Sequence, residues 1–195
     1  MLRQRSRMDT PLINNIFDVC GRFAKSTIDM ATPSDVFFCV FQLLMQRQAE
    51  VFGDSPPDNI TQKLVKEINA MCSTHTFFEV AILYELSNWL RENRYQWRCS
   101  EAMKNSLSMF LLGITDKMPD MQKQELLGSS PWEMDPPAFA ITVEGYAFDQ
   151  LEELMEDHWF TLLWERHYKV DRNSKTEASF GHIMIAKEEE PDVFE

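Results

Sequence analysis

The sequence predicts a mainly α-helical, single-domain bundle of about six to seven helices with a small two-stranded β element in its C-terminal third. Three observations predict this fold class. Apolar residues recur every three to four positions over most of residues 10–128. Gly and Pro stand at the ends of several of these stretches. Residues 138–144 and 179–186 are short, apolar and flanked by turn-forming residues, which is typical of strands.

The first two helices are predicted from their start and stop signals. Thr10-Pro11 and Thr32-Pro33 each combine a capping hydroxyl with a proline at the first helical position. The second of these helices is expected to end at Phe52, because Gly53 favours a helix end. Its residues 36–45 contain a single polar side chain, so we expect this helix to be buried on every side.

Further helices follow from the same periodicity. They are expected at about 58–71, over a stretch from Phe77 to Leu90, from the cap Ser100 to Gly113, over 119–127 and over 146–168. The segment from Ser129 to Pro137 holds three prolines and predicts an irregular loop. The two strands flank one helix, and two interpretations apply: they pair in parallel with each other as a β-α-β unit, or they form a sheet with another chain.

The chain is expected to divide into four parts. These are a flexible basic arm (1–9), a helical core (10–128), a loop with a β-α-β-like part packed on that core (129–186), and an acidic disordered tail (187–195).

The net charge of −12 and the pI of about 4.8 restrict the possible partners. Binding to nucleic-acid phosphates requires clustered Lys and Arg, so we expect no direct nucleic-acid binding and favour protein partners with a basic surface or segment. No apolar run reaches about 18 residues, so no membrane insertion is expected. Cys20, Cys39, Cys72 and Cys99 lack the close pairing of a metal site, and predict reduced thiols in the cytoplasm.

Enzyme signatures are absent from the sequence. It has no glycine-rich phosphate loop, no nucleophile elbow and no metal-ligand pair such as Glu-x-x-His. We therefore expect no cofactor, no metal and no catalytic residue. Cys99 stands close to Arg94, Arg98 and Lys104, so two interpretations apply: a thiol with a lowered pKa, or an ordinary cysteine at a helix start.

The predicted helix at 146–168 carries a run of acids and is the first candidate binding surface. Residues 144–165 contain seven acids and no Lys or Arg. The run is open to three interpretations: a solvated helix face, a docking face for a basic partner, or a metal or catalytic site. The candidate residues are Asp149, Glu152, Glu153, Glu156 and Asp157.

Two further candidates combine aromatic side chains with charge or proline. Arg94, Trp97 and Arg98 lie in a stretch where cations alternate with aromatics, which suits internal ion pairs, a protein contact or stacking on nucleic-acid bases. Trp132 and Met134 lie in the proline-rich loop. There Trp132 either packs back onto the body of the protein or is presented to a partner.

These observations favour a non-catalytic protein-interaction module, an acidic adaptor or a chaperone-like subunit of a larger complex. The general profile is that of small acidic chaperones of bacterial secretion systems, although no motif assigns the chain to them. The alternatives are an inhibitor that mimics nucleic acid and an enzyme with an unrecognised site.

Overall fold

The computed structural model describes residues 33–121, 129–157 and 176–188. This part of the chain is mainly α-helical and includes a small sheet, as predicted. Its helices are α2 (Pro33–Phe52), α3 (Asp58–Thr74), α4 (Phe77–Glu92), α5 (Glu101–Lys104), α6 (Leu107–Leu111) and α7 (Gly145–Asp157), with a single 3-10 turn, η1 (Pro131–Glu133). Its strands are β1 (Trp97–Cys99), β2 (Phe139–Val143), β3 (Glu177–Phe180) and β4 (Ile183–Lys187).

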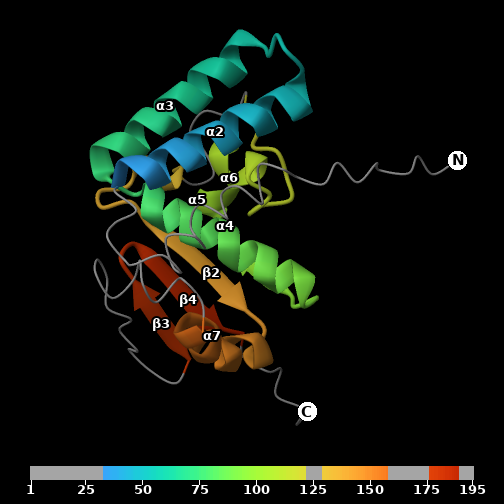
Figure 1. Cartoon of the computed structure of the whole chain (residues 1–195), viewed down its shortest axis with the longest axis vertical. Helices are drawn as coiled ribbons and strands as arrows, with labels where there is room; N and C mark the ends of the chain where they lie inside the picture. Colours follow the sequence, from blue (N-terminus) through green and yellow to red (C-terminus); the bar gives the residue numbers. More distant parts are fainter. Residues whose placement is uncertain (1–32, 122–128, 158–175, 189–195) are drawn as a thin grey trace, which may run out of the picture.

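The helices α2 to α6 lie towards one end of the described part, and the sheet with α7 lies towards the other (Figure 1). In this view α2 and α3 lie at the top, α4 crosses beneath them, and the sheet lies below with α7 beside it. α2 packs on α4 and α6, α3 packs on α6, and α7 packs on β4. Buried apolar side chains of both the helices and the sheet belong to a single hydrophobic cluster.

The expected start at Pro33 and the expected end at Phe52 are confirmed for α2. Gly53 follows with φ +80°, and its amide donates to the Ala49 carbonyl at 2.8 Å. A side chain would be strained at this angle, which explains why Gly ends the helix. The helix predicted to start at Thr10 and the basic arm 1–9 lie outside the described residues.

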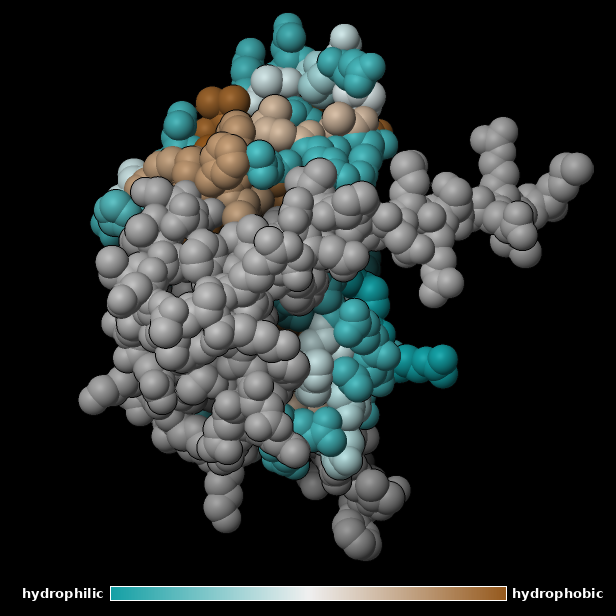
Figure 2. Space-filling model, in the orientation of Figure 1, coloured by the Kyte–Doolittle hydropathy of each residue, from teal (hydrophilic) through white to brown (hydrophobic). Residues whose placement is uncertain are grey.

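The expectation that α2 is buried on every side is wrong. Val36, Val40 and Leu43 are buried, but Phe38 is 56% exposed and Met45 is 42% exposed. Figure 2 shows the resulting tan and brown surface at the top of the molecule, over α2 and α3. The reason is position: α2 lies in the outer layer, so only one side of it faces α4 and α6.

The single helix expected from Ser100 to Gly113 is also wrong, because the structure has two short helices there. Ser100 caps α5, as predicted, and accepts a hydrogen bond from Met103 N at 3.4 Å. Ser106 then caps α6 in the same way, accepting from Met109 N at 3.3 Å. A capping serine inside the stretch interrupts the helix, since its side chain competes for the backbone amides. Residues 119–121 are not helical, and 122–127 lie outside the described residues.

The parallel β-α-β pairing is confirmed, but the sheet has four strands and not two. β2 and β4 are parallel, with Phe139 opposite Ile183 and Val143 opposite Lys187. The strand order is β1-β2-β4-β3. The predicted strand 179–186 is in fact split by a turn at Gly181, where φ is +50°, so that β3 and β4 pair antiparallel. β1 has three residues, too few to show an alternating pattern.

Two predicted boundaries move as a consequence. β1 belongs to the part of the chain expected to be purely helical, yet it pairs with β2. Lys187, expected to start the acidic tail, is the last residue of β4. Residues 189–195 and the later part of the predicted helix 146–168 lie outside the described residues. In the three described ranges, no helix is both long and apolar enough to cross a membrane.

Candidate functional site

A cleft of about 1340 Å³ opens where the helices meet the edge of the sheet. Its walls come from α3, β1, α5, the segment that follows α6, and η1. The volume exceeds the roughly 300–1,000 Å³ that is usual for small-molecule pockets. The shape therefore suits a macromolecular segment better than a compact ligand.

Most basic side chains of the described part line this cleft. They are Lys63 and Lys66 from α3, Arg98 from β1, Lys104 from α5 and Lys117 from the segment after α6. Elsewhere the described ranges contain only Arg47, Arg91, Arg94 and Lys187. Lys63 Nζ lies 3.9 Å from Glu67 Oε1 and Arg98 lies 2.9 Å from Glu188, so two of these cations already have an acidic partner outside the lining.

Four acids share the lining and neutralise part of this charge: Glu101, Asp116, Asp120 and Glu133. Lys104 Nζ lies 2.6 Å from Glu101 Oε1, and Lys66 Nζ lies 3.6 Å from Glu133 Oε1. Exposed ion pairs of this kind contribute about 0–1 kcal/mol, because water and ions screen them. Both lysines can exchange these partners for another anion at little cost. Lys117 forms no ion pair within the described part of the chain.

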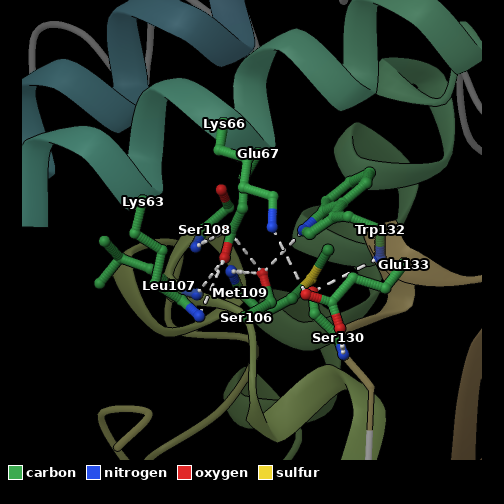
Figure 3. Close-up of polar contacts among 10 residues, drawn as sticks. All are labelled: Lys63, Lys66, Glu67, Ser106, Leu107, Ser108, Met109, Ser130, Trp132 and Glu133. Carbon is green, nitrogen blue, oxygen red and sulfur yellow. Dashed lines mark hydrogen bonds and ion pairs between the residues drawn. The ribbon is translucent and has the colours of Figure 1, made fainter. Parts of the chain in front are cut away.

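The Glu67 carboxylate connects α3, which lines the cleft, to the start of α6 behind it (Figure 3). Glu67 is 3% exposed. Its Oε2 accepts hydrogen bonds from Ser106 Oγ at 2.9 Å and from Ser108 N at 2.7 Å, and its Oε1 accepts one from Leu107 N at 2.9 Å. These amides begin α6, and the N-terminus of a helix favours negative charge. Glu67 therefore joins α3 to α6.

Trp132 connects η1 to the same network. Its Nε1 donates to Ser106 Oγ at 3.1 Å, and its ring meets that of Phe139 edge-on with centroids 5.3 Å apart. Ser130 and Glu133 form a reciprocal capping box around the turn. Of the two interpretations of Trp132, the structure shows the first, in which its side chain packs back onto the body of the protein. Met134, the next candidate residue, is 42% exposed.

Cys99 lines the cleft as an unreactive thiol. Burial raises the pKa of Cys99 to about 11, although Lys104 acts in the opposite direction. Its Sγ donates to the Ile114 carbonyl at 3.4 Å. The interpretation of a lowered pKa is therefore wrong, because loss of solvation outweighs the nearby cation.

The acidic helix lies at the other end of the described part. Ala147, Phe148 and Leu151 bury one side of α7. Asp149 accepts from Lys187 Nζ through both carboxylate oxygens, each at 2.9 Å, and so ties α7 to β4. The backbone of α7 is described through Asp157, but the side chains of Glu152, Glu153, Glu156 and Asp157 lie outside the described part.

The basic and aromatic residues after α4 are divided between two environments. Arg94 is exposed, with φ +62°. Trp97 is half-buried beneath the Arg91 guanidinium, which lies 5.5 Å from the centroid of its ring. Arg98 forms an ion pair of 2.9 Å with Glu188. The structure brings Trp97 and Arg98 together in the cleft lining, whereas Arg94 is not part of it.

Lys63, Lys66, Lys104 and Lys117 are cleft residues that the sequence analysis did not select as binding residues. Lys63 and Lys66 are three positions apart on α3, and this spacing was the one available signal. Their proximity to β1 and to the segment after α6 depends on tertiary packing. Within the described ranges, no group of three or more His, Cys, Asp or Glu side chains is placed to hold a metal ion.

No protein-family model matches the chain, and a search of curated proteins finds no significant match.

Proposed function

We propose that this protein is a non-catalytic protein-interaction module, an acidic adaptor or chaperone-like subunit of a larger complex. It binds a partner that carries a basic surface or segment, and α7 is the docking element. The observation that carries the proposal is the charge of α7, which has five acids and no Lys or Arg, whereas the cleft lining mixes five basic with four acidic side chains.

The anchoring of α7 supports this role. Asp149 and the buried side of the helix hold it against β4, so the docking acids sit on a fixed backbone. Asp149 therefore anchors the helix, and Glu152, Glu153 and Glu156 bind the partner. Opposite charges on two proteins accelerate their encounter and select between partners. The proposal places the protein in the cytoplasm, where the thiols of Cys72 and Cys99 stay reduced.

The test compares two triple charge reversals. One variant carries Glu152→Lys, Glu153→Lys and Glu156→Lys. The control carries Asp54→Lys, Asp135→Lys and Glu177→Lys, three exposed acids outside α7. The tagged full-length proteins are used to isolate complexes from the native host at low and moderate salt, and partner amounts are measured by quantitative mass spectrometry. Circular dichroism and thermal unfolding verify that each variant is folded.

We expect the α7 variant to lose at least about tenfold of its partner, since removing several close charge pairs costs more than 1.4 kcal/mol. The control should retain it. Equal losses in both variants would show a dependence on net charge alone and would contradict docking at α7. A DNA- or RNA-processing enzyme as the partner would favour nucleic-acid mimicry over the adaptor role.

A further inference from the structure

We infer that the cleft holds an uncharged, extended peptide segment of a partner protein, which adds to the sheet as a strand beside β1. This binding is separate from docking at α7, because it takes place on different elements and depends on backbone hydrogen bonds instead of acidic side chains.

The outer edge of β1 carries the inference. β1 is the first strand in the order β1-β2-β4-β3, so only one of its edges is paired. The Ser100 amide donates to the Ala140 carbonyl of β2 at 2.9 Å. In an antiparallel pair, residues that bond to the neighbouring strand alternate with residues whose N–H and C=O groups face away from it. Trp97 and Cys99 therefore direct their backbone groups away from β2.

These outward backbone groups have no partner. Within the part of the chain that the structure describes, neither the amide nor the carbonyl of Trp97 or Cys99 forms a hydrogen bond. Both residues line the cleft, so a chain that enters the cleft lies beside them. An unpaired strand edge is a template for a further strand, and strand addition is a common way to bind an extended peptide.

The position of β1 is fixed from its other side. Trp97 Nε1 and Cys99 Sγ both donate to the Ile114 carbonyl, each at 3.4 Å. These side-chain bonds hold the strand between β2 and the segment that follows α6, without using the outward backbone groups. A peptide would therefore meet a strand edge that is already in place, which lowers the entropic cost of binding.

The charge of the lining favours an uncharged segment. Five basic and four acidic side chains are mixed in it. Four of the basic side chains already lie 2.6–3.9 Å from a carboxylate: Lys63, Lys66, Arg98 and Lys104. A charged peptide would compete with these pairs. Neutral side chains such as Asn59 and Gln62 of α3 also line the cleft, and their amide groups suit the backbone of an uncharged peptide.

The depth of the edge favours a single segment over a second copy of this chain. β1 has only three residues and lies in a cleft whose other walls come from α3, α5, η1 and the segment after α6. A second copy would have to bring a folded sheet and its helices into this space. A single added strand lies only about 4.8 Å from β1.

The test follows backbone amides of the full-length protein by NMR. In the free protein, the amides of Trp97 and Cys99 should exchange with solvent faster than the amide of Ser100, which is bonded to β2. The probe is a peptide that alternates Thr and Val and is blocked at both ends, so that it carries no charge. Its counterpart has N-methyl groups on the central amides, which removes the donors and keeps the side chains.

We expect the probe peptide to shift the Trp97 and Cys99 resonances and to slow the exchange of both amides. The N-methylated peptide should bind at least about tenfold more weakly, because hydrogen bonds to the edge are lost. Cys99→Pro removes one outward N–H group without removing a bond to β2 and should also weaken binding about tenfold. Cys99→Ala removes only the thiol and should change the affinity less than about threefold. The peptide comparison on the wild-type protein does not depend on the folding of either variant.

Four results would overturn the inference. They are slow exchange of Trp97 and Cys99 in the free protein, no binding of the probe peptide, equal binding of its N-methylated counterpart, and a dimer in sedimentation that protects the same amides. The variant with charge reversals at Glu152, Glu153 and Glu156 should bind the peptide as well as wild type. Failure of this inference is thus distinguishable from failure of docking at α7.

Discussion

The carboxylate of Glu67 and the amide of Ser108 join two helices through a hydrogen bond of 2.7 Å. Two further donors, Ser106 Oγ and Leu107 N, complete the contact. Because α6 has only five residues, most of its stability comes from such contacts and not from its own backbone. The position of α6 thus depends on one side chain of α3.

Glu67→Gln tests this dependence. The amide group keeps the size of the side chain but removes its charge and replaces one acceptor with a donor that faces backbone N–H groups. We expect the free energy of unfolding to fall by about 2–3 kcal/mol, which lowers the melting temperature by roughly 4–12 °C. Glu50→Gln, in an exposed pair with Arg47, is the control and should change stability by less than about 0.5 kcal/mol. A neutral result for Glu67→Gln would contradict the role of the carboxylate.

Trp132→Ala should destabilise the protein, because the ring packs against Phe139 and its Nε1 bonds to Ser106. For a half-buried tryptophan we expect a loss of about 2 kcal/mol in chemical denaturation. Trp132→Phe keeps the ring contact and should recover more than half of that loss. Met134→Ala, two positions along and exposed, should be nearly neutral. If Trp132→Ala lowered the free energy of unfolding as little as Met134→Ala, the packing of Trp132 against Phe139 would not stabilise the protein.

Glu85 should make stability depend on pH. Burial raises its pKa from 4.5 to about 8, and the charge of Glu92 adds to the rise. Between these pH values the folded state holds a proton that the unfolded state has lost. The contribution of protonated Glu85 to the free energy of unfolding is therefore complete below about pH 4.5, and it declines as the pH rises towards 8. The full effect is on the order of 4 kcal/mol.

Glu85→Gln removes this titration and serves as the reference. Chemical denaturation at intervals between pH 5 and 8 should show the wild type losing stability relative to the variant as the pH increases. A difference that stays constant over this range would show that Glu85 ionises at an ordinary pKa in the folded protein.

The cysteines should react with alkylating agents in a fixed order. Cys72 is exposed, whereas Cys99 is half-buried and its raised pKa keeps it as a thiol at pH 8. The thiolate is the reactive form. Brief labelling of the native protein, followed by peptide mass spectrometry, should modify Cys72 and spare Cys99, and denaturant should remove the difference. Equal labelling of both in the native state would contradict the burial of Cys99.

Local patterns in the sequence determined the elements whose signals are contained within a few neighbouring residues. The Pro33 start, the Gly53 end and the Ser100 cap each depend on hydrogen bonds or backbone angles within about one turn. Two apolar strands on either side of a helix also indicated the parallel pairing of β2 and β4 as one of two alternatives, and the structure decided between them. The negative charge of α7 could also be predicted, because it depends only on which residues the segment contains.

Tertiary structure decided what depends on neighbours distant in the chain. The periodicity of α2 could not show that Phe38 and Met45 face outward, because the side that is covered depends on where α4 and α6 lie. β1 is too short to have a pattern and exists because β2 supplies its hydrogen-bond partners. The cleft has the same origin: Lys63, Lys66, Lys104 and Lys117 are scattered in sequence, and only the packing of α3 and α5 around the sheet edge brings them together.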